Sequence, residues 1–290
     1  MSSSLVVPTN KENPKASDKF GGFSSLQANL QPVIIKSLKT IGGIFVGRIA
    51  VEIIPHSEAS LQADIDVIKK YPQVDCVNIP DLMSFELRPW QAVKVTQPAL
   101  PTIPHVRAMD IDLAKPLPMR DDFIKFGVKE VLIIAGDPPK DLTRTVYPTE
   151  TIDVIHKFRE ELPDVKVYAG VDQYRSGIRE ELYRVERKAQ AGAAGFFTQP
   201  FFDMRFLEMY ADLLDGHEVY WGVSPVLSSR SRGYWERKDK AVFPKDFQPT
   251  MDWNVELAKR VIDFIKTSSV GLYFMPITID ISELLPKVFD

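Results

Sequence analysis

From Gly47 onward the chain alternates short β-rich apolar runs with longer stretches whose apolar residues recur at helical spacing. Strands that alternate with helices in this way are parallel and are joined by crossover helices. Several runs, such as VLIIAG and GFFTQPF, are apolar almost throughout, as expected where both faces of a sheet are covered. The pattern predicts strands at Arg48–Ile54, Val74–Ile79, Thr102–Met109, Glu130–Ile134, Val165–Ala169, Ala194–Thr198, Glu218–Val223 and Gly271–Met275.

Helical spacing fills most of the intervals between these runs. The apolar positions that predict helices are Leu61, Ile65 and Ile68; Phe123 to Phe126; Ile152, Ile155, Phe158 and Leu162; Ile178, Leu182 and Val185; Phe206, Met209, Leu213 and Leu214; and Val255, Ala258, Val261, Ile262 and Ile265. Thr149 is predicted to cap the third of these helices. A further helix is predicted before the first strand, over Phe23–Thr40.

The number of strand and helix signals predicts the architecture. About eight units in roughly 240 residues fit a closed (β/α)₈ TIM barrel. A doubly wound open sheet is the alternative, but its dinucleotide-binding form needs a Gly-x-Gly-x-x-Gly motif, and the first strand is followed by PHSEAS. We therefore predict one barrel domain over residues 21–290, preceded by an arm over residues 1–20 that its Ser, Asn, Lys and Pro content predicts to be disordered.

Composition narrows the class of protein. The formal charge is −3, from 36 basic and 39 acidic residues, and this balance disfavours a nucleic-acid partner. The single cysteine, Cys76, excludes an intrachain disulfide and indicates a reducing compartment. No apolar run approaches the ~20 residues of a membrane helix, and the N-terminus lacks the features of a secretory signal. We expect a cytoplasmic protein with no membrane partner.

In TIM barrels the active site lies at the C-terminal ends of the strands. The predicted ends carry a set of polar residues that would converge on one mouth, and these are Glu52, Asn78, His105, Gly136, Asp137, Asp172, Gln199 and Ser224. Glu52 lies within the apolar run AVEII, where burial raises the pKa of a carboxyl and suits it to donate a proton near neutrality. The alternative for Glu52 is a salt bridge at the rim of the barrel.

Two further strand ends offer ligand contacts. Gly136 permits close backbone approach before Asp137, although an aspartate after a strand is also common as a turn or cap residue. Gln199 lies in the apolar segment FFTQPFFD, where its amide has the paired donor and acceptor that recognise the edge of a heterocycle. The alternative is a buried glutamine that satisfies neighbouring backbone, with Phe201 and Phe202 as ordinary core residues.

The remaining polar residues leave a phosphate contact open and disfavour a metal site and a serine-hydrolase site. Arg187 and Lys188 end a helix, where they either reach a phosphate or complement the helix dipole. The four histidines form no His-x-x-x-His or Cys-x-x-Cys spacing, so we predict no metal site. The serines at 228, 229 and 231 lack a Gly-x-Ser-x-Gly elbow, which disfavours a hydrolase of that type.

Taken in order, four segments resemble the methylenetetrahydrofolate reductase family. They are VEIIP at Val51–Pro55, IIAGDPP at Ile133–Pro139, RKAQAGAAGFFTQPFFD at Arg187–Asp203 and GVSPV at Gly222–Val226. The resemblance implies a barrel enzyme of one-carbon metabolism and methionine biosynthesis. Such an enzyme uses FAD to pass a hydride between NADH or NADPH and the tetrahydrofolate derivative, interconverting 5,10-methylenetetrahydrofolate and 5-methyltetrahydrofolate. Enzymes of this kind often assemble, so a homo-oligomer is also expected.

The resemblance also implies roles for individual residues. Glu52 matches the glutamate that supplies the proton opening the one-carbon bridge, and Gln199 matches a folate contact. Asp137 matches an aspartate that contacts the pterin and tunes the flavin, and Phe274 stands where a substrate-contacting tyrosine is common. The remaining matches concern the flavin, and they are His105, Ala135, Gly136, Asp172 and Lys188, the last as a diphosphate contact.

Several segments depart from the family pattern. Ala135 replaces the arginine of an Arg-Gly-Asp motif, AGVDQYRSG lacks the usual Tyr-Pro-Glu and His-Pro residues, and PITID replaces an Asn-x-Arg motif. Ser228 or Ser229 stands where an aromatic residue stacks on the nicotinamide. These departures leave two alternatives open, a flavin-free NADH-dependent reductase and a non-catalytic folate-binding barrel.

Overall fold

The structure is a computed structural model that describes residues 40–41, 44–45, 47–139, 145–266, 270–277 and 279–290. The predicted arm over residues 1–20 lies outside the described residues. So does the predicted helix over Phe23–Thr40, apart from Thr40, which begins the short strand β1 (Thr40–Ile41) and pairs antiparallel with β2 (Ile44–Phe45). Among the described helices, none is long and apolar enough to span a bilayer.

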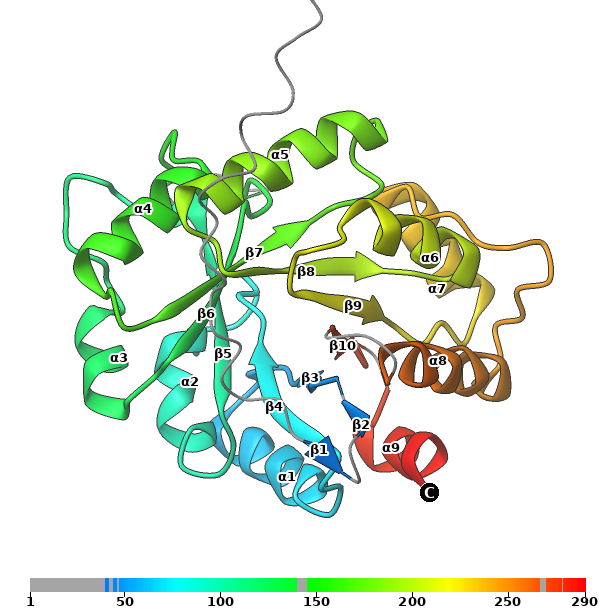
Figure 1. Cartoon of the computed structure of the whole chain (residues 1–290). Coiled ribbons are helices and arrows are strands. Elements are labelled where there is room, and N and C mark those ends of the chain that lie inside the picture. Colours follow the sequence, from blue (N-terminus) through cyan, green and yellow to red (C-terminus); the bar gives the residue numbers. More distant parts are fainter. Residues whose placement is uncertain (1–39, 42–43, 46, 140–144, 267–269, 278) are drawn as a thin grey trace, which may run out of the picture. The chain divides into compact units, whose positions relative to one another are not determined.

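Eight parallel strands form a closed barrel in the order β10-β3-β4-β5-β6-β7-β8-β9. Figure 1 shows these strands surrounded by helices. The strands are β3 (Ile49–Glu52), β4 (Val74–Ile79), β5 (Thr102–Arg107), β6 (Glu130–Ile134), β7 (Lys166–Val171), β8 (Gly195–Pro200), β9 (Val219–Val223) and β10 (Gly271–Phe274). The predicted (β/α)₈ barrel is therefore confirmed, and each predicted strand is found within a few residues of its expected bounds.

The helices are α1 (Glu58–Ile68), α2 (Pro89–Thr96), α3 (Arg120–Phe126), α4 (Thr151–Glu161), α5 (Ile178–Ala191), α6 (Met204–Leu213), α7 (Ser229–Tyr234), α8 (Met251–Ile265) and α9 (Ile281–Phe289). A 3₁₀ turn, η1 (Ala108–Asp110), follows β5, and a π-helical turn, η2 (Trp235–Asp239), follows α7. Each helix predicted after the first strand is present, whereas α2, α7 and α9 were not predicted. Two of these three are no longer than eight residues, too short for a clear helical period.

The predicted N-cap of α4 is wrong. The cap residue is Glu150, and the hydroxyl of Thr149 instead donates to the carbonyl oxygen of Ile111 at 2.7 Å. Thr149 is therefore used to join two loops. A single sequence does not distinguish this tertiary bond from a local cap, since the same hydroxyl can make either.

Alternation along the strands divides the buried apolar residues into two layers. The outward-facing side chains pack with the helices in a large core that includes Val51, Val77 and Phe274. The inward-facing side chains fill the barrel with a second cluster, formed by Ala50, Cys76, Ile103, Leu132, Tyr168, Phe197, Tyr220, Tyr273 and Met275. Because side chains alternate between faces, Glu52 shares the inward face of β3 with Ala50.

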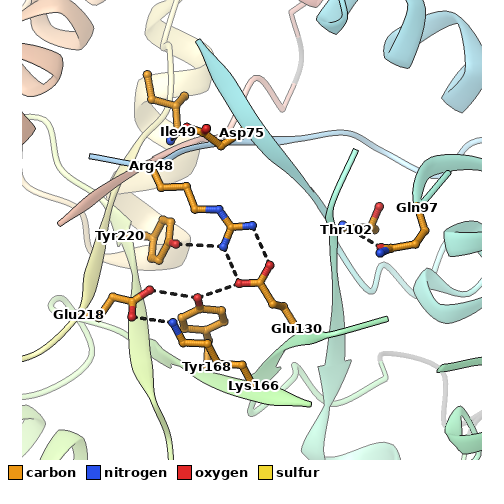
Figure 2. A network of polar contacts seen from close by, with 10 residues as sticks. All are labelled: Arg48, Ile49, Asp75, Gln97, Thr102, Glu130, Lys166, Tyr168, Glu218 and Tyr220. Atoms are coloured by element: carbon orange, nitrogen blue, oxygen red, sulfur yellow. Dashed lines mark hydrogen bonds and ion pairs between the residues drawn. The ribbon is translucent and has the colours of Figure 1, made fainter. Parts of the chain in front are cut away.

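A polar network closes the N-terminal end of the barrel (Figure 2). Arg48, just before β3, donates through Nη2 to Oε2 of Glu130 at 2.7 Å. The hydroxyl of Tyr168 lies 2.9 Å from Glu130 and 3.0 Å from Glu218, and Lys166 pairs with Glu218 at 2.6 Å. Figure 2 shows these side chains, which lie in or just before β3, β6, β7 and β9, pointing toward one another, so the charges at this end are mutually satisfied.

Candidate active site

Glu52 ends β3 inside the barrel, where 9% of its surface is exposed. The hydroxyl of Tyr273 in β10 donates a hydrogen bond to Oε2 of Glu52. Burial raises the pKa of Glu52 to about 7, against the opposing effect of this hydrogen bond. Burial thus acts on the pKa of Glu52 in the direction that the sequence predicts. The alternative of a rim salt bridge has no partner for Glu52 in the described part of the chain.

His105 lies at the inward face of β5, where its ring packs edge to face against that of Tyr273 with centroids 6.2 Å apart. Asn78 of β4 donates through Nδ2 to Nε2 of His105 at 3.1 Å, so the ring carries its proton on Nδ1. Burial lowers the pKa of His105 to about 3, and the ring is therefore neutral at physiological pH. Among the described residues, Oδ1 of Asn78 is buried without a hydrogen-bond partner, a costly state for a buried polar atom.

The loop after β6 carries Ala135, Gly136 and Asp137 at the rim. Gly136 has φ +87°, and a Cβ there would lie 3.1 Å from Cβ and Nε of Arg107. Only glycine combines this left-handed backbone with such close packing. Arg107 is buried beneath this loop. Its Nη2 donates to the carbonyl oxygen of Asp137 at 2.6 Å, and its Nε pairs with Asp110 at 3.2 Å. These contacts hold the loop in place.

The side chain of Asp137 points away from the core and is 68% exposed. Its carboxylate pairs with Nζ of Lys238 in η2 at 3.2 Å. Because β6 and β9 are separated by two strands in the barrel order, this ion pair joins loops from different sides of the mouth. The arrangement places Asp137 at the entrance, apart from the buried Glu52.

Gln199 lies on β8 and is half-buried, next to an irregularity in the pairing of β8 with β9. Its backbone oxygen accepts a hydrogen bond from Nε2 of Gln173 at 2.7 Å. Gln173 is thus a glutamine that satisfies neighbouring backbone, whereas no such hydrogen bond of the Gln199 amide is found among the described residues. Among the described residues, Oε1 of Gln173 is buried without a hydrogen-bond partner. Phe201 and Phe202 are buried in the core.

Asp172 and Lys188 both contact the buried Glu181, which the sequence did not single out. Lys188 donates through Nζ to the carbonyl oxygen of Gly170 at 2.6 Å and lies 3.8 Å from Oε1 of Glu181. Glu181 is 2% exposed, and its Oε1 also accepts from the backbone N–H of Asp172 at 3.1 Å. Burial lowers the pKa of Lys188, and burial raises the pKa of Asp172.

This arrangement bears on the flavin that the resemblance implies. Cationic side chains that are not already paired with protein acids favour the binding of a diphosphate. Lys188 is held by Gly170 and Glu181, and Ala135 offers no side-chain donor where the family has an arginine. The lysine that the resemblance assigns to the FAD diphosphate is therefore already engaged within the protein.

Phe274 does not reach the barrel interior. It follows Tyr273 directly, so alternation along β10 turns it outward, and it packs at 1% exposure in the core between strands and helices. The inward position belongs to Tyr273, which the sequence reading did not select. The expected substrate contact at Phe274 is therefore corrected, because a single-residue shift along a strand changes the face of the sheet.

A cavity of about 350 Å³ lies outside this centre, beyond the ends of β4 and β5. Arg88 and Arg107 line it together with Asp81 and Asp110, and Arg88 pairs with both acids, at 2.8 Å and 3.2 Å. Among the described residues, no group of three or more His, Cys, Asp or Glu side chains has the arrangement of a metal site.

The comparison with protein families decides the relationship. A sequence model of methylenetetrahydrofolate reductase matches residues 88–250, more than half of the chain. The chain belongs to the methylenetetrahydrofolate reductase family. The match includes His105, Asp137 and Gln199, whereas Glu52 and Tyr273 lie outside it. Membership supports a folate-related reductase and implies a folate substrate; family members are generally flavin-dependent.

Solved structures with this fold carry other activities. A 2,3-dimethylmalate lyase of the PEP mutase/isocitrate lyase superfamily aligns with a TM-score of 0.51 and 12% identity, over 84% of this chain and 76% of its own. An oxaloacetate acetylhydrolase aligns with a TM-score of 0.51 and 11% identity, over 83% and 78% of the two chains. At such low identity these similarities support the barrel fold alone.

Proposed function

We propose that this protein reduces 5,10-methylenetetrahydrofolate to 5-methyltetrahydrofolate, with Glu52 as the general acid and a reduced nicotinamide as the hydride source. The buried carboxyl of Glu52 carries the proposal, because burial raises its pKa to about 7 and so keeps the proton available near neutrality. The position of this carboxyl at the C-terminal end of β3 is where barrel enzymes place catalytic groups.

The chemistry needs one proton and one hydride. Glu52 gives its proton to a nitrogen of the one-carbon bridge, the carbon–nitrogen bond opens, and a hydride then adds to the carbon to form the methyl group. The neutral His105 and the free oxygens of Asn78 and Gln173 add no charge to the centre. They suit the edge of an uncharged pterin, with Gln199 as a further amide contact and Asp137 as a contact at the entrance.

We propose further that the hydride passes directly from NADH or NADPH to the folate. Lys188, which the resemblance assigns to the flavin diphosphate, is engaged by Gly170 and Glu181. This favours the flavin-free reductase over the FAD enzyme that the family resemblance implies. We therefore derive no step through a flavin.

The test begins with the visible spectrum of the purified full-length protein, followed by an assay with methylenetetrahydrofolate and either NADH or NADPH. We expect a colourless protein that oxidises the nicotinamide. With nicotinamide deuterated at the transferred position, the deuterium should be found in the methyl group of the product. A bound flavin with loss of the label to solvent would support the flavin route instead. Folate binding without turnover with either donor would indicate the non-catalytic barrel.

A further inference from the structure

Tyr273 makes the one side-chain hydrogen bond to Glu52 found in the described part of the chain. It lies in β10, where its Cα pairs with that of Ala50 in β3, two residues before Glu52. Both side chains therefore face inward on adjacent strands, and the phenol reaches toward the end of β3. The contact joins residues that are 221 positions apart in the sequence, so the closure of the barrel creates it.

The ring of Tyr273 is fixed on two sides. The ring of Phe197 packs against it edge to face with centroids 5.2 Å apart, and His105 does the same at 6.2 Å. Tyr273 is 4% exposed. A buried phenol held in this way has one orientation for its hydroxyl oxygen, and the hydroxyl is directed at Oε2 of Glu52.

We propose that Tyr273 is a positioning residue for the acid Glu52, which it holds by one oxygen so that the transferable proton resides on the other. Since Oε2 accepts from the phenol, it acts as the carbonyl oxygen of the neutral acid, and the proton is carried by Oε1. When that proton leaves for the substrate, the new negative charge on the carboxylate is stabilised by the same phenol. This inference rests on the proposed function.

The surroundings of Glu52 make the effect measurable. Tyr273 faces it from β10, Asn78 pairs with it in register from β4, and His105 lies behind Tyr273 on β5. Asn78 does not titrate, and His105, with a pKa of about 3, stays neutral across the working range. Burial raises the pKa of Glu52 to about 7 and the phenol lowers it, so removal of the phenol must raise it further.

The experiment compares the pH dependence of kcat in the full-length protein and in Tyr273→Phe. Turnover needs the protonated acid, so activity falls as pH rises through the pKa of Glu52. In Tyr273→Phe we expect this midpoint to move up by about one pH unit, because a hydrogen bond to a charged group is worth about that much. We also expect kcat on the low-pH plateau to fall roughly tenfold, since the developing carboxylate loses its donor.

Tyr220→Phe is the matched control. Tyr220 is also buried in the barrel and also packs on Phe197, with centroids 4.2 Å apart, but its hydroxyl faces Arg48 at the opposite end. The same single oxygen is removed, and we expect the pH midpoint to stay unchanged. A midpoint that is equal in the protein and in Tyr273→Phe, with both folded by circular dichroism, would overturn the assignment of Tyr273.

A direct titration separates this inference from the proposed function. Carbon-13 NMR of the labelled carboxyl of Glu52, assigned by its absence in Glu52→Gln, reports the pKa without turnover. If the protein does not reduce folate but the carboxyl titrates higher in Tyr273→Phe, the proposed function fails and the coupling of Tyr273 to Glu52 stands. If the protein turns over and the carboxyl titrates unchanged in Tyr273→Phe, the inference fails and the function stands.

Discussion

The two ends of the barrel interior solve the burial of polar groups in opposite ways. At the N-terminal end, Arg48 and Lys166 face Glu130 and Glu218, with Tyr168 between the two acids. Burial opposes ionisation of Glu130, but the guanidinium of Arg48 outweighs burial and lowers the pKa of this carboxyl. At the C-terminal end Glu52 faces the phenol of Tyr273, and burial raises its pKa to about 7.

The difference shows what each end is suited to do. Paired charges are satisfied within the protein, so the N-terminal network can stabilise the barrel but has no group left for a ligand. At the other end, the free oxygens of Asn78 and Gln173 and a carboxyl near its titration point are costly to bury unless a ligand uses them. This contrast agrees with the placement of stability and function at opposite faces of TIM barrels.

The largest effect should come from Glu52→Gln. The amide keeps the shape of the neutral acid but cannot donate a transferable proton, so we expect kcat to fall by about 10²–10⁴-fold with folate binding retained. Steady-state kinetics and calorimetric folate binding measure the two effects. Unchanged turnover would remove Glu52 from the mechanism and leave the contrast between the two ends without a catalytic meaning.

Glu130→Gln should damage stability where Glu52→Gln damages catalysis. It leaves Arg48, whose side chain is 28% exposed, without its counter-charge, and we expect a loss of about 3 kcal/mol in the free energy of unfolding. Urea denaturation measures this loss, and kcat of the folded variant should stay close to that of the parent. The control is Glu58→Gln, which breaks an exposed pair with Lys94 and should cost about 0.5 kcal/mol or less.

The raised pKa of Glu52 should also appear in the pH dependence of stability. Between its ordinary pKa of 4.5 and about 7 the folded state binds more protons than the unfolded state. Stability from this group is therefore present at low pH and is lost as pH rises, by roughly 2 kcal/mol between pH 5 and pH 8. Urea midpoints across this range should fall more steeply for the parent than for Glu52→Gln. Parallel curves would show that Glu52 is not held neutral by the fold.

The smallest effect is expected at the mouth. Lys238 and Asp137 form an exposed ion pair, with side chains 50% and 68% exposed. Lys238→Met should change the free energy of unfolding by less than about 1 kcal/mol, and salt should remove most of that difference. A larger, salt-insensitive loss would mean that the link across the mouth is as structural as the network at the other end.

The sequence by itself determined the barrel. Short apolar runs, separated by segments whose apolar residues recur at helical spacing, predicted all eight strands. This was possible because the periodicity of apolar residues is a local property of the sequence. The same reasoning placed Glu52, His105 and Gln199 in the C-terminal halves of β3, β5 and β8, and Asp172 directly after β7. It also predicted the raised pKa of Glu52, since the apolar neighbours that bury this carboxyl are adjacent in the chain.

Only the tertiary structure decided what these residues touch. Tyr273 reaches Glu52 because barrel closure sets β10 beside β3, and Lys188 reaches the carbonyl oxygen of Gly170 because α5 packs against β7. Such contacts join different strands and helices, and no local period encodes them. The sequence predicted a substrate contact at Phe274, whereas the neighbouring Tyr273 is the residue that faces inward. A match of residue types does not determine which side of the sheet a side chain faces. Which side chains come within hydrogen-bond distance depends on the register of the strands and on the closure of the barrel. Both are established only in the folded chain.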